Sequence, residues 1–278
     1  MLVDLRNKAE LSRDDAAEQL EIARQTLWRY ETGYNSEIKK MFIHALCALY
    51  RVGEDDRRQL LYLQEEVRKD GWWQSYGDAI FGNVELFIDL EQAARRVTTV
   101  QLTLLPGLVQ TAAYRRAMAQ VYHPPVAEDE IERHIELLTR RQARLDEPAD
   151  RFTLVVLLSE AALRYPVGGP AVMEEQCRHL IELSQRPNVS IRIIPIGIGA
   201  HLGLQVGSFV LLEFPEHVNP KLSESPVVYV EGYTGALYLD KAGEIEKYQA
   251  ACSILEGTAL GERESRELLL DIAEEYRA

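Results

Sequence analysis

The chain has 278 residues, 46% of them hydrophobic, and a formal net charge of −13 at pH 7. This length allows two domains with buried cores, and the acidic balance argues against unspecific nucleic-acid binding by the whole molecule. No apolar run is long enough to span a bilayer, and the charged start MLVDLRNKAE lacks the apolar core of a signal peptide. We therefore expect a cytoplasmic protein that does not bind membranes.

Motifs for metal binding and for common enzyme chemistry are absent from the sequence. The three cysteines, Cys47, Cys177 and Cys252, are far apart, and no C-x-x-C pair occurs. We expect buried thiols and no zinc site. No nucleophile elbow, phosphate-binding loop or dinucleotide fingerprint is present either. The sequence therefore predicts no cofactor and no enzymatic activity.

The stretch Leu11–Gly33 predicts two short helices joined by a tight turn, after a first helix near the N-terminus. Ser12 is the expected N-cap of the earlier helix of the pair, because its hydroxyl can accept a bond from an orphan amide. The later helix is expected over about Arg24–Glu31, and Gly33 suits its end. Glu21 falls in the turn, where a left-handed backbone costs a non-glycine residue roughly 1–2 kcal/mol.

The outer face of this later helix carries hydrogen-bond donors suited to DNA. Two guanidinium groups, from Arg24 and Arg29, lie beside the amide of Gln25, which can read a base edge. An ordinary helical hairpin is the alternative, but such hairpins seldom place these groups opposite their apolar seam. The predicted DNA-contacting residues are Arg13, Arg24, Gln25, Thr26, Trp28, Arg29 and, in the following loop, Asn35.

This pattern resembles the helix-turn-helix of the phage-repressor-like (XRE) regulators. The residues that fit are Ser12, Ala17, Ile22, Arg24, Thr26, Leu27, Arg29, Glu31 and Gly33. Two positions depart: Glu21 replaces the usual turn glycine, and Arg13 replaces the usual glutamine. The resemblance implies a lambda-repressor-like domain that binds a double-stranded DNA operator.

Further helical patterns complete a five-helix domain over residues 1–70. Leu2, Val3 and Leu5 indicate the first helix, Ser36 is the expected cap of a helix over about residues 37–50, and another helix is expected over about residues 54–69. Residues 1–70 carry 12 Lys and Arg against 14 Asp and Glu, a net charge of −2, whereas the rest of the chain carries −11. This balance predicts weak unspecific DNA binding with steep salt dependence.

The aromatic and glycine-bearing stretch over residues 71–78 predicts a domain junction, with a second domain over residues 71–278. Trp72 and Trp73 in this stretch have two interpretations. They plug a core, or they form part of a ligand or partner surface.

The second domain mixes helices and strands without strict alternation, which favours an α+β fold over a doubly wound one. Arg140, Arg141 and Arg144 are expected to favour the C-terminal end of their helix dipole. An extended stretch is expected over 100–108 and an irregular glycine loop over 197–207. Strands are predicted over 152–158, 189–195, 208–214 and 226–231, and helices over 83–97, 111–121 (capped by Thr111), 128–145, 172–184, 243–257 and 262–276.

This second region is similar to the actinobacterial regulators with a C-terminal DUF5753 domain, which include WhiJ-like and antitoxin-like regulators of Streptomyces. The similarity rests on LLPGLVQTAAYRRAM at 104–118, RRQARLDEP at 140–148, the segment from SEAALRYPVGGP to SIRIIP at 159–195, GAHLGL at 199–204 and VVYVEGYTGALYLD at 227–240. It implies a transcription factor, often encoded beside a small partner protein of the DUF397 type.

The glycine loop of the second domain is a candidate binding region, because glycines let a ligand approach the backbone. His201 lies in this loop, and Glu231, Tyr233 and Tyr238 are expected to orient a small-molecule effector. Alternatively, the glycines make turns while the aromatics fill a core or dimer interface, or a partner protein docks there. A hydrolytic pair of His201 with a glutamate is a further alternative.

Together these patterns predict a homodimeric, sequence-specific DNA-binding regulator whose C-terminal domain dimerises and receives a ligand or small partner protein. The alternative is an antitoxin-like interaction module with a weak or vestigial helix-turn-helix. An enzyme ranks third.

Overall fold

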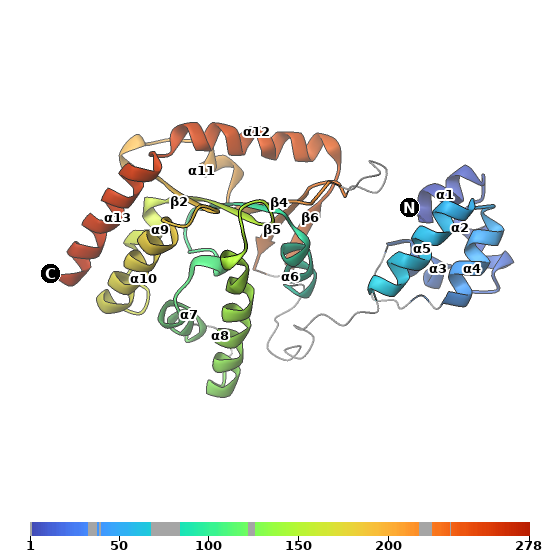
Figure 1. Ribbon diagram of the computed structural model, residues 1–278, viewed down its shortest axis with the longest axis horizontal. Coiled ribbons are helices and arrows are strands. Elements are labelled where there is room, and N and C mark those ends of the chain that lie inside the picture. The colour runs from blue at the N-terminus through green and yellow to red at the C-terminus, as the bar shows by residue number, and fades with distance from the viewer. Residues whose placement is uncertain are drawn as a thin grey trace. The chain divides into compact units, whose positions relative to one another are not determined.

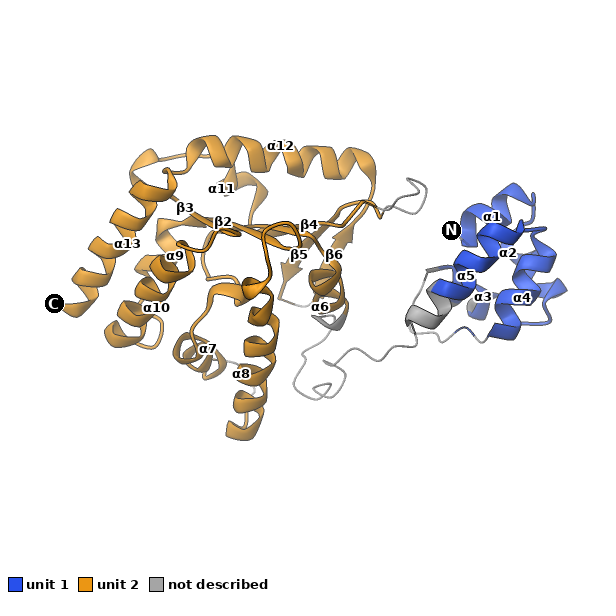
Figure 2. Cartoon of the chain, viewed as in Figure 1, with its two compact units in different colours: residues 1–72 blue, residues 73–278 orange. Residues whose placement is uncertain are grey.

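The computed structural model of the chain describes residues 2–32, 38, 40–67, 84–121, 126–216, 224–233 and 235–278. The chain divides into two compact units, residues 1–72 (unit 1) and residues 73–278 (unit 2), which Figure 2 shows in different colours. Each unit has its own hydrophobic core.

Unit 1 is helical throughout its described elements. These are α1 (Leu2–Lys8), α2 (Arg13–Gln19), α3 (Arg24–Thr32), α4 (Lys40–Leu49) and α5 (Glu54–Val67). The Ser12 hydroxyl accepts a hydrogen bond from the Asp15 backbone N at 3.1 Å, which confirms the predicted N-cap. Glu21 has a φ of 54°, which confirms the predicted left-handed turn. The predicted cap Ser36 and the helix-ending Gly33 lie outside the described residues.

The core of unit 1 joins all of these helices. Leu27 on α3 is fully buried between the other helices, and the thiol of Cys47 is buried as predicted. The buried members of this core are Leu2, Leu5, Ala16, Ala17, Leu27, Ile43, Leu46, Cys47, Tyr50 and Leu60.

Unit 2 is a mixed α+β domain, as predicted, built on a six-stranded sheet. Its strands are β1 (Arg96–Gln101), β2 (Thr153–Ser159), β3 (Val189–Ile194), β4 (Phe209–Glu213), β5 (Val227–Gly232) and β6 (Gly235–Leu239). Its α-helices are α6 (Val84–Ala93), α7 (Ala112–Ala119), α8 (Glu128–Gln142), α9 (Glu160–Arg164), α10 (Pro170–Leu183), α11 (Gly203–Val206), α12 (Ala242–Thr258) and α13 (Glu262–Arg277).

The strand order is β3-β2-β1-β4-β5-β6. Strands β1, β2 and β3 are parallel, and β4, β5 and β6 pair antiparallel with their neighbours. At the centre of the sheet, Thr98 of β1 lies between Val155 of β2 and Leu211 of β4. Parallel pairing at one side and antiparallel pairing at the other explains why the sequence shows no strict βαβ alternation.

The two faces of this sheet carry separate hydrophobic clusters. In β2, Val156 and Leu158 join the cluster that includes residues of α6, α7 and α10, while Val155 and Leu157 join the cluster that includes residues of α11 and α12. Figure 1 shows these two groups of helices on opposite sides of the sheet. A strand buried on both faces reads as a continuous apolar run rather than an alternating one, which is how β2 appears in the sequence.

Several predicted boundaries in unit 2 were wrong. The helix predicted over 83–97 ends at Ala93, and Val97 lies in β1, because β1 finds a hydrogen-bonding strand on each side. The extended stretch 100–108 ends as a strand at Gln101, and Gly107–Val109 forms a 3₁₀ turn. The helix predicted over 128–145 ends at Gln142 and tightens into a 3₁₀ turn over Ala143–Asp146.

The glycine loop and the last strand of the sheet were also misjudged. Residues 197–207 were expected to be irregular, but a 3₁₀ turn covers Ile196–Ile198 and α11 covers Gly203–Val206. Strand β6 was not predicted. Thr111 caps α7 as predicted, by accepting a hydrogen bond from the Tyr114 backbone N at 3.1 Å.

Candidate nucleic-acid interface

Helix α3 corresponds to the predicted DNA-reading helix. Leu27 on one side of α3 is fully buried, and Tyr30 is half-buried with its ring centroid 5.7 Å from that of Phe42. Thr26 is half-buried, and its backbone N donates to the Ala23 carbonyl at 2.8 Å at the start of the helix. Leu27 and Tyr30 therefore turn the same side of α3 toward the core.

Three predicted contacts on α3 are described only in their backbone, and one predicted contact is not described. The side chains of Gln25, Trp28 and Arg29 lie outside the described part of the structure, although all three residues are helical. Asn35 falls outside the described residues altogether. Their DNA contacts stay predictions.

Arg24 is exposed at the start of α3. Its Nε lies 2.9 Å from Oδ1 of Asp14 on α2, and the two side chains are 69% and 64% exposed. Exposed ion pairs of this kind contribute only about 0–1 kcal/mol. Arg24 can therefore exchange this carboxylate for a DNA phosphate at small cost.

Arg13 is bound to a carboxylate of unit 1, although its side chain is still 30% exposed. Its Nε donates to Oε2 of Glu31 at 2.8 Å, and the Glu31 side chain is fully buried. Nε of Arg6 donates to the other oxygen, Oε1, at 2.5 Å. One carboxylate on α3 thus binds guanidinium groups from both α1 and α2.

Arg6 extends this network to the chain between α1 and α2. Its Nη1 donates to the Leu11 carbonyl at 2.9 Å and to Oδ1 of Asn7 at 3.2 Å. Close by, the Tyr50 hydroxyl is buried and finds no hydrogen-bond partner among the described residues. Burial, followed by the charge of Glu31, raises the pKa of Tyr50 to about 12. The ionic network ties the end of α3 to α1 and α2.

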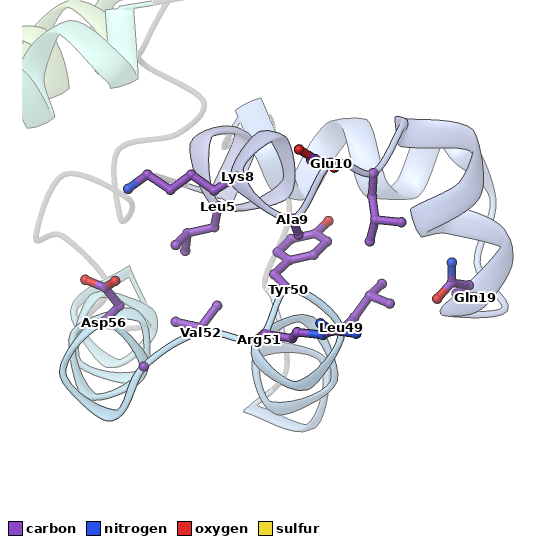
Figure 3. Close-up of a pocket in the computed structure, with 12 residues that line it drawn as sticks. Leu5, Lys8, Ala9, Glu10, Gln19, Leu49, Tyr50, Arg51, Val52 and Asp56 are labelled. Carbon is purple, nitrogen blue, oxygen red and sulfur yellow. The ribbon is translucent and has the colours of Figure 1, made fainter.

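A groove of about 570 Å³ crosses unit 1 between α1 and α2 on one side and the α4–α5 connection on the other. Figure 3 shows Tyr50 beside Ala9 within it. Two residues that line it, Glu10 and Arg51, have left-handed backbones with φ of 56° and 51°. None of the predicted DNA contacts lines this groove. The twelve lining residues are Leu5, Lys8, Ala9, Glu10, Leu11, Gln19, Leu49, Tyr50, Arg51, Val52, Gly53 and Asp56.

The predicted ligand region of unit 2 is centred on His201. This residue is half-buried, and its Nδ1 finds no hydrogen-bond partner within the described structure. A Cβ added at Gly203 would lie 2.9 Å from the imidazole, so glycine is required there for His201 to keep its place. The predicted residues Trp72 and Trp73 lie outside the described residues.

The other three predicted ligand residues do not form one pocket with His201. Glu231 and Tyr233 are exposed near the β5–β6 turn. Tyr238 packs on Tyr229, with ring centroids 5.2 Å apart, and burial raises its pKa to about 12. Tyr238 packs on the cluster that includes residues of α6 and α10, whereas Leu202, next to His201, packs on the cluster that includes residues of α12. A ligand-binding role for these residues stays a prediction.

The comparisons with known proteins assign both units. Residues 2–60 match the family model described as "Helix-turn-helix domain", and residues 84–271 match the one described as "Domain of unknown function (DUF5753)". The chain belongs to the DUF5753 family. No curated protein and no solved structure gave a significant match. The helix-turn-helix of this DUF5753 protein supports a DNA-binding regulator.

Sequence reasoning missed the residues that anchor the two units internally. Arg6 and Glu31 are 25 positions apart, so no local pattern pairs them. In unit 2, Arg141 was expected to favour the helix dipole. It does lie in the last turn of α8, and in addition its Nε and Nη2 bind both oxygens of the buried Glu91 on α6, at 2.8 and 2.9 Å. Arg144 lies 4.0 Å from the ring centroid of Phe152 and donates to the carbonyl that ends α6. These arginines fix α8 to α6 in the DUF5753 domain.

The described residues of this DUF5753 protein contain neither a membrane-spanning helix nor a cluster of metal ligands. No helix there is long and apolar enough to cross a membrane. No group of three or more His, Cys, Asp or Glu side chains there is placed to hold a metal ion. Cys177 and Cys252 are buried, and burial raises the pKa of each thiol to about 12. Both thiols are therefore protonated and unreactive at neutral pH.

Proposed function

We propose that this DUF5753 protein is a sequence-specific transcriptional regulator that acts in the cytoplasm and binds an operator as a dimer through α3. Unit 2 receives the signal, as a small-molecule effector or a small DUF397-like partner protein. The observation that carries the proposal is the buried Glu31 carboxylate, which fixes α3 to α1 and α2 while Arg24 stays exposed at the other end of α3.

A reading helix needs this kind of support. Contacts to base edges discriminate only when the side chains that make them are held in fixed positions by the scaffold. Two guanidinium groups on one buried carboxylate restrict how α3 can rotate and slide against its neighbours. The outer side of α3 is then presented in one orientation, as a major-groove helix requires.

Operator binding by the full-length chain tests the proposal. The operator is selected from random double-stranded DNA, and affinity is then measured by fluorescence anisotropy between about 50 and 200 mM salt. Arg24→Ala and Arg29→Ala are expected to weaken specific binding, and each lost phosphate contact lowers the salt slope by about 1. Arg58→Ala on α5, which removes an exposed ion pair with Asp55, is the matched control. Unchanged binding in both α3 variants refutes the proposal.

One observation favours a second candidate, an antitoxin-like interaction module with a vestigial helix-turn-helix. Arg13 and Arg24 already bond carboxylates of their own chain, through Glu31 and Asp14. Such pairing reduces the positive charge available to DNA. Co-purification with a co-expressed DUF397-like protein, without any DNA shift by the pair, supports this candidate over the first.

The proposal assigns no catalytic activity to unit 2. A screen against esters, amides and phosphoesters tests this point with the full chain. Turnover that disappears in His201→Ala overturns it, because His201 is the predicted general base of the enzymatic alternative.

A further inference from the structure

The two edges of the unit 2 sheet differ in how their backbone groups are used. At the β3 edge, the Ile193 carbonyl accepts a hydrogen bond from the Leu260 backbone N at 2.8 Å. The Ile193 backbone N donates to the Ser265 hydroxyl at 3.0 Å. The connection between α12 and α13 therefore occupies this edge, and another strand cannot add to it there.

The β6 edge carries the features of a strand that can still pair. Among the described residues, β5 is the only strand that pairs with β6, so every second residue of β6 directs its backbone N–H and C=O away from β5. The sequence of β6, Gly-Ala-Leu-Tyr-Leu, contains no charge and no proline, the residues that usually protect an edge. Leu237, at its centre, is 60% exposed.

Charge makes this edge suited to a like-charged partner. Each chain carries a net charge of −13, so two copies repel over most of their surface. Strand β6 brings no charged side chain to a contact. An exposed apolar side chain, Tyr233, lies beside it in the β5–β6 turn.

We propose that β6 pairs antiparallel with β6 of a second copy of this chain, which joins the two sheets into one. The choice of a second copy rests on the proposed function, in which two helix-turn-helix units act together. The occupied β3 edge is a second argument for a contact between two copies. Because the β3 edge is occupied, head-to-tail addition of β6 to β3 is blocked, and β6-to-β6 contact ends at two copies.

The register of this contact follows from the length of the strand. Pairing about Leu237, the middle residue of Gly235–Leu239, uses the whole strand and places Leu237 opposite its symmetry mate. Directly opposed residues in antiparallel strands have Cβ atoms about 4.5–5.5 Å apart. The exposed leucines of the two copies therefore cover each other.

Solution mass tests the contact in the absence of DNA. Light scattering coupled to size exclusion is expected to give twice the 31.7 kDa of one chain for the full-length protein. Leu237→Lys is expected to give the mass of one chain, because two charges would then face each other across the two-fold axis. Ile254→Lys, a similarly exposed position in the C-terminal half of α12, is the matched control and is expected to remain a dimer.

Cross-linking tests the register by an independent route. Leu237→Cys is expected to form a disulfide-linked dimer on mild oxidation, because the two cysteines would face each other, whereas Ile254→Cys lies outside the contact and is not. The three native cysteines are buried and should add no background cross-linking. A monomeric wild-type chain, a dimer that persists in Leu237→Lys, or equal cross-linking of the two cysteine variants overturns the inference. A dimer that binds no selected DNA sequence is consistent with the β6 contact and instead refutes the proposed function.

Discussion

The Nε of Arg13 lies 2.8 Å from Oε2 of Glu31, and the Glu31 carboxylate is completely buried. Arg13 begins α2 and Glu31 lies in the last turn of α3, so this contact spans the helix-turn-helix from end to end. With Arg6 on the other oxygen, the carboxylate connects three helices. The orientation of α3, the proposed DNA-reading helix, is therefore set by one ionic group as well as by the apolar seam.

Replacing this carboxylate should destabilise unit 1 selectively. Glu31→Gln leaves two guanidinium groups without their counter-charge, and removing one partner of a buried ion pair typically costs about 3–5 kcal/mol. We expect the unfolding transition of unit 1, followed by circular dichroism in urea, to shift to lower denaturant while that of unit 2 is unchanged. Asp55→Asn, which breaks the exposed pair with Arg58, is the control and should shift neither. Equal effects of the two substitutions would contradict this view of Glu31.

Removing the carboxylate beside Arg24 should strengthen DNA binding. Asp14→Asn frees Arg24 from an exposed ion pair and removes a negative charge from the predicted interface. Release from a pair worth about 0.5–1 kcal/mol corresponds to an affinity gain of roughly two- to fivefold. Anisotropy titrations on the selected operator measure it. The same change in an Arg24→Ala background should give a smaller gain, and an equal gain there would show that Asp14 acts without Arg24.

A glycine in the turn of the helix-turn-helix should stabilise unit 1. Glu21 has a φ of 54°, a backbone that costs a non-glycine residue roughly 1–2 kcal/mol. Glycine removes this strain but lowers the free energy of unfolding by about 0.4–1 kcal/mol, because its unfolded chain has more freedom. We expect Glu21→Gly to add about 1 kcal/mol, or about 4–8 °C in the melting temperature of a unit this size. Glu18→Gly inside α2 should instead lower the melting temperature. A lower melting temperature in Glu21→Gly would be the contrary result.

Acid should weaken unit 2 through His179. Burial lowers the pKa of this imidazole on α10 below 6.5. The charge of Arg186 lowers this pKa further, whereas the charges of Glu182 and Glu175 raise it by less than burial lowers it. The unfolded chain then binds the proton more readily than the folded one, so the stability from neutral His179 is complete above pH 6.5 and falls as the pH drops below it. Urea midpoints of unit 2 between about pH 8 and 5 should show this loss, and His179→Gln should reduce it. His44→Gln, at an exposed position in unit 1, should leave the unit 2 profile unchanged.

Local chemistry made parts of this fold predictable from the sequence. The caps at Ser12 and Thr111 and the left-handed turn at Glu21 depend on one or two neighbouring residues, and all three were confirmed. The buried run of β2 was recognisable because a strand covered on both faces needs apolar side chains on both. Residues within a few positions of each other determine these features.

Features that depend on distant partners were not predictable. Val97 continues a helical apolar pattern, and only pairing with β2 and β4 turns its segment into a strand. Strand β6 exists because β5 precedes it at the right register, although its own pattern is short. In the candidate interface, the ion pair of Arg13 with the buried Glu31 had no signal in the sequence, and the predicted DNA contact of Arg13 stays a prediction. Long-range pairing of strands and charges decides these positions.

Unit 1 carries a conformational cost in its left-handed residues, and this cost affects the apparent affinity of the unit for DNA. Glu10, Glu21 and Arg51 all carry this backbone without being glycine, whereas the left-handed positions described in unit 2 are Gly168, Gly169, Gly199 and Gly207. A unit with such a conformational cost has a smaller folded fraction, and the apparent dissociation constant is the intrinsic one divided by that fraction. Operator DNA at about 100 times its dissociation constant would in turn stabilise the folded form by about 2.7 kcal/mol. Operator binding, as proposed for unit 1, would therefore offset part of the conformational cost of these left-handed residues.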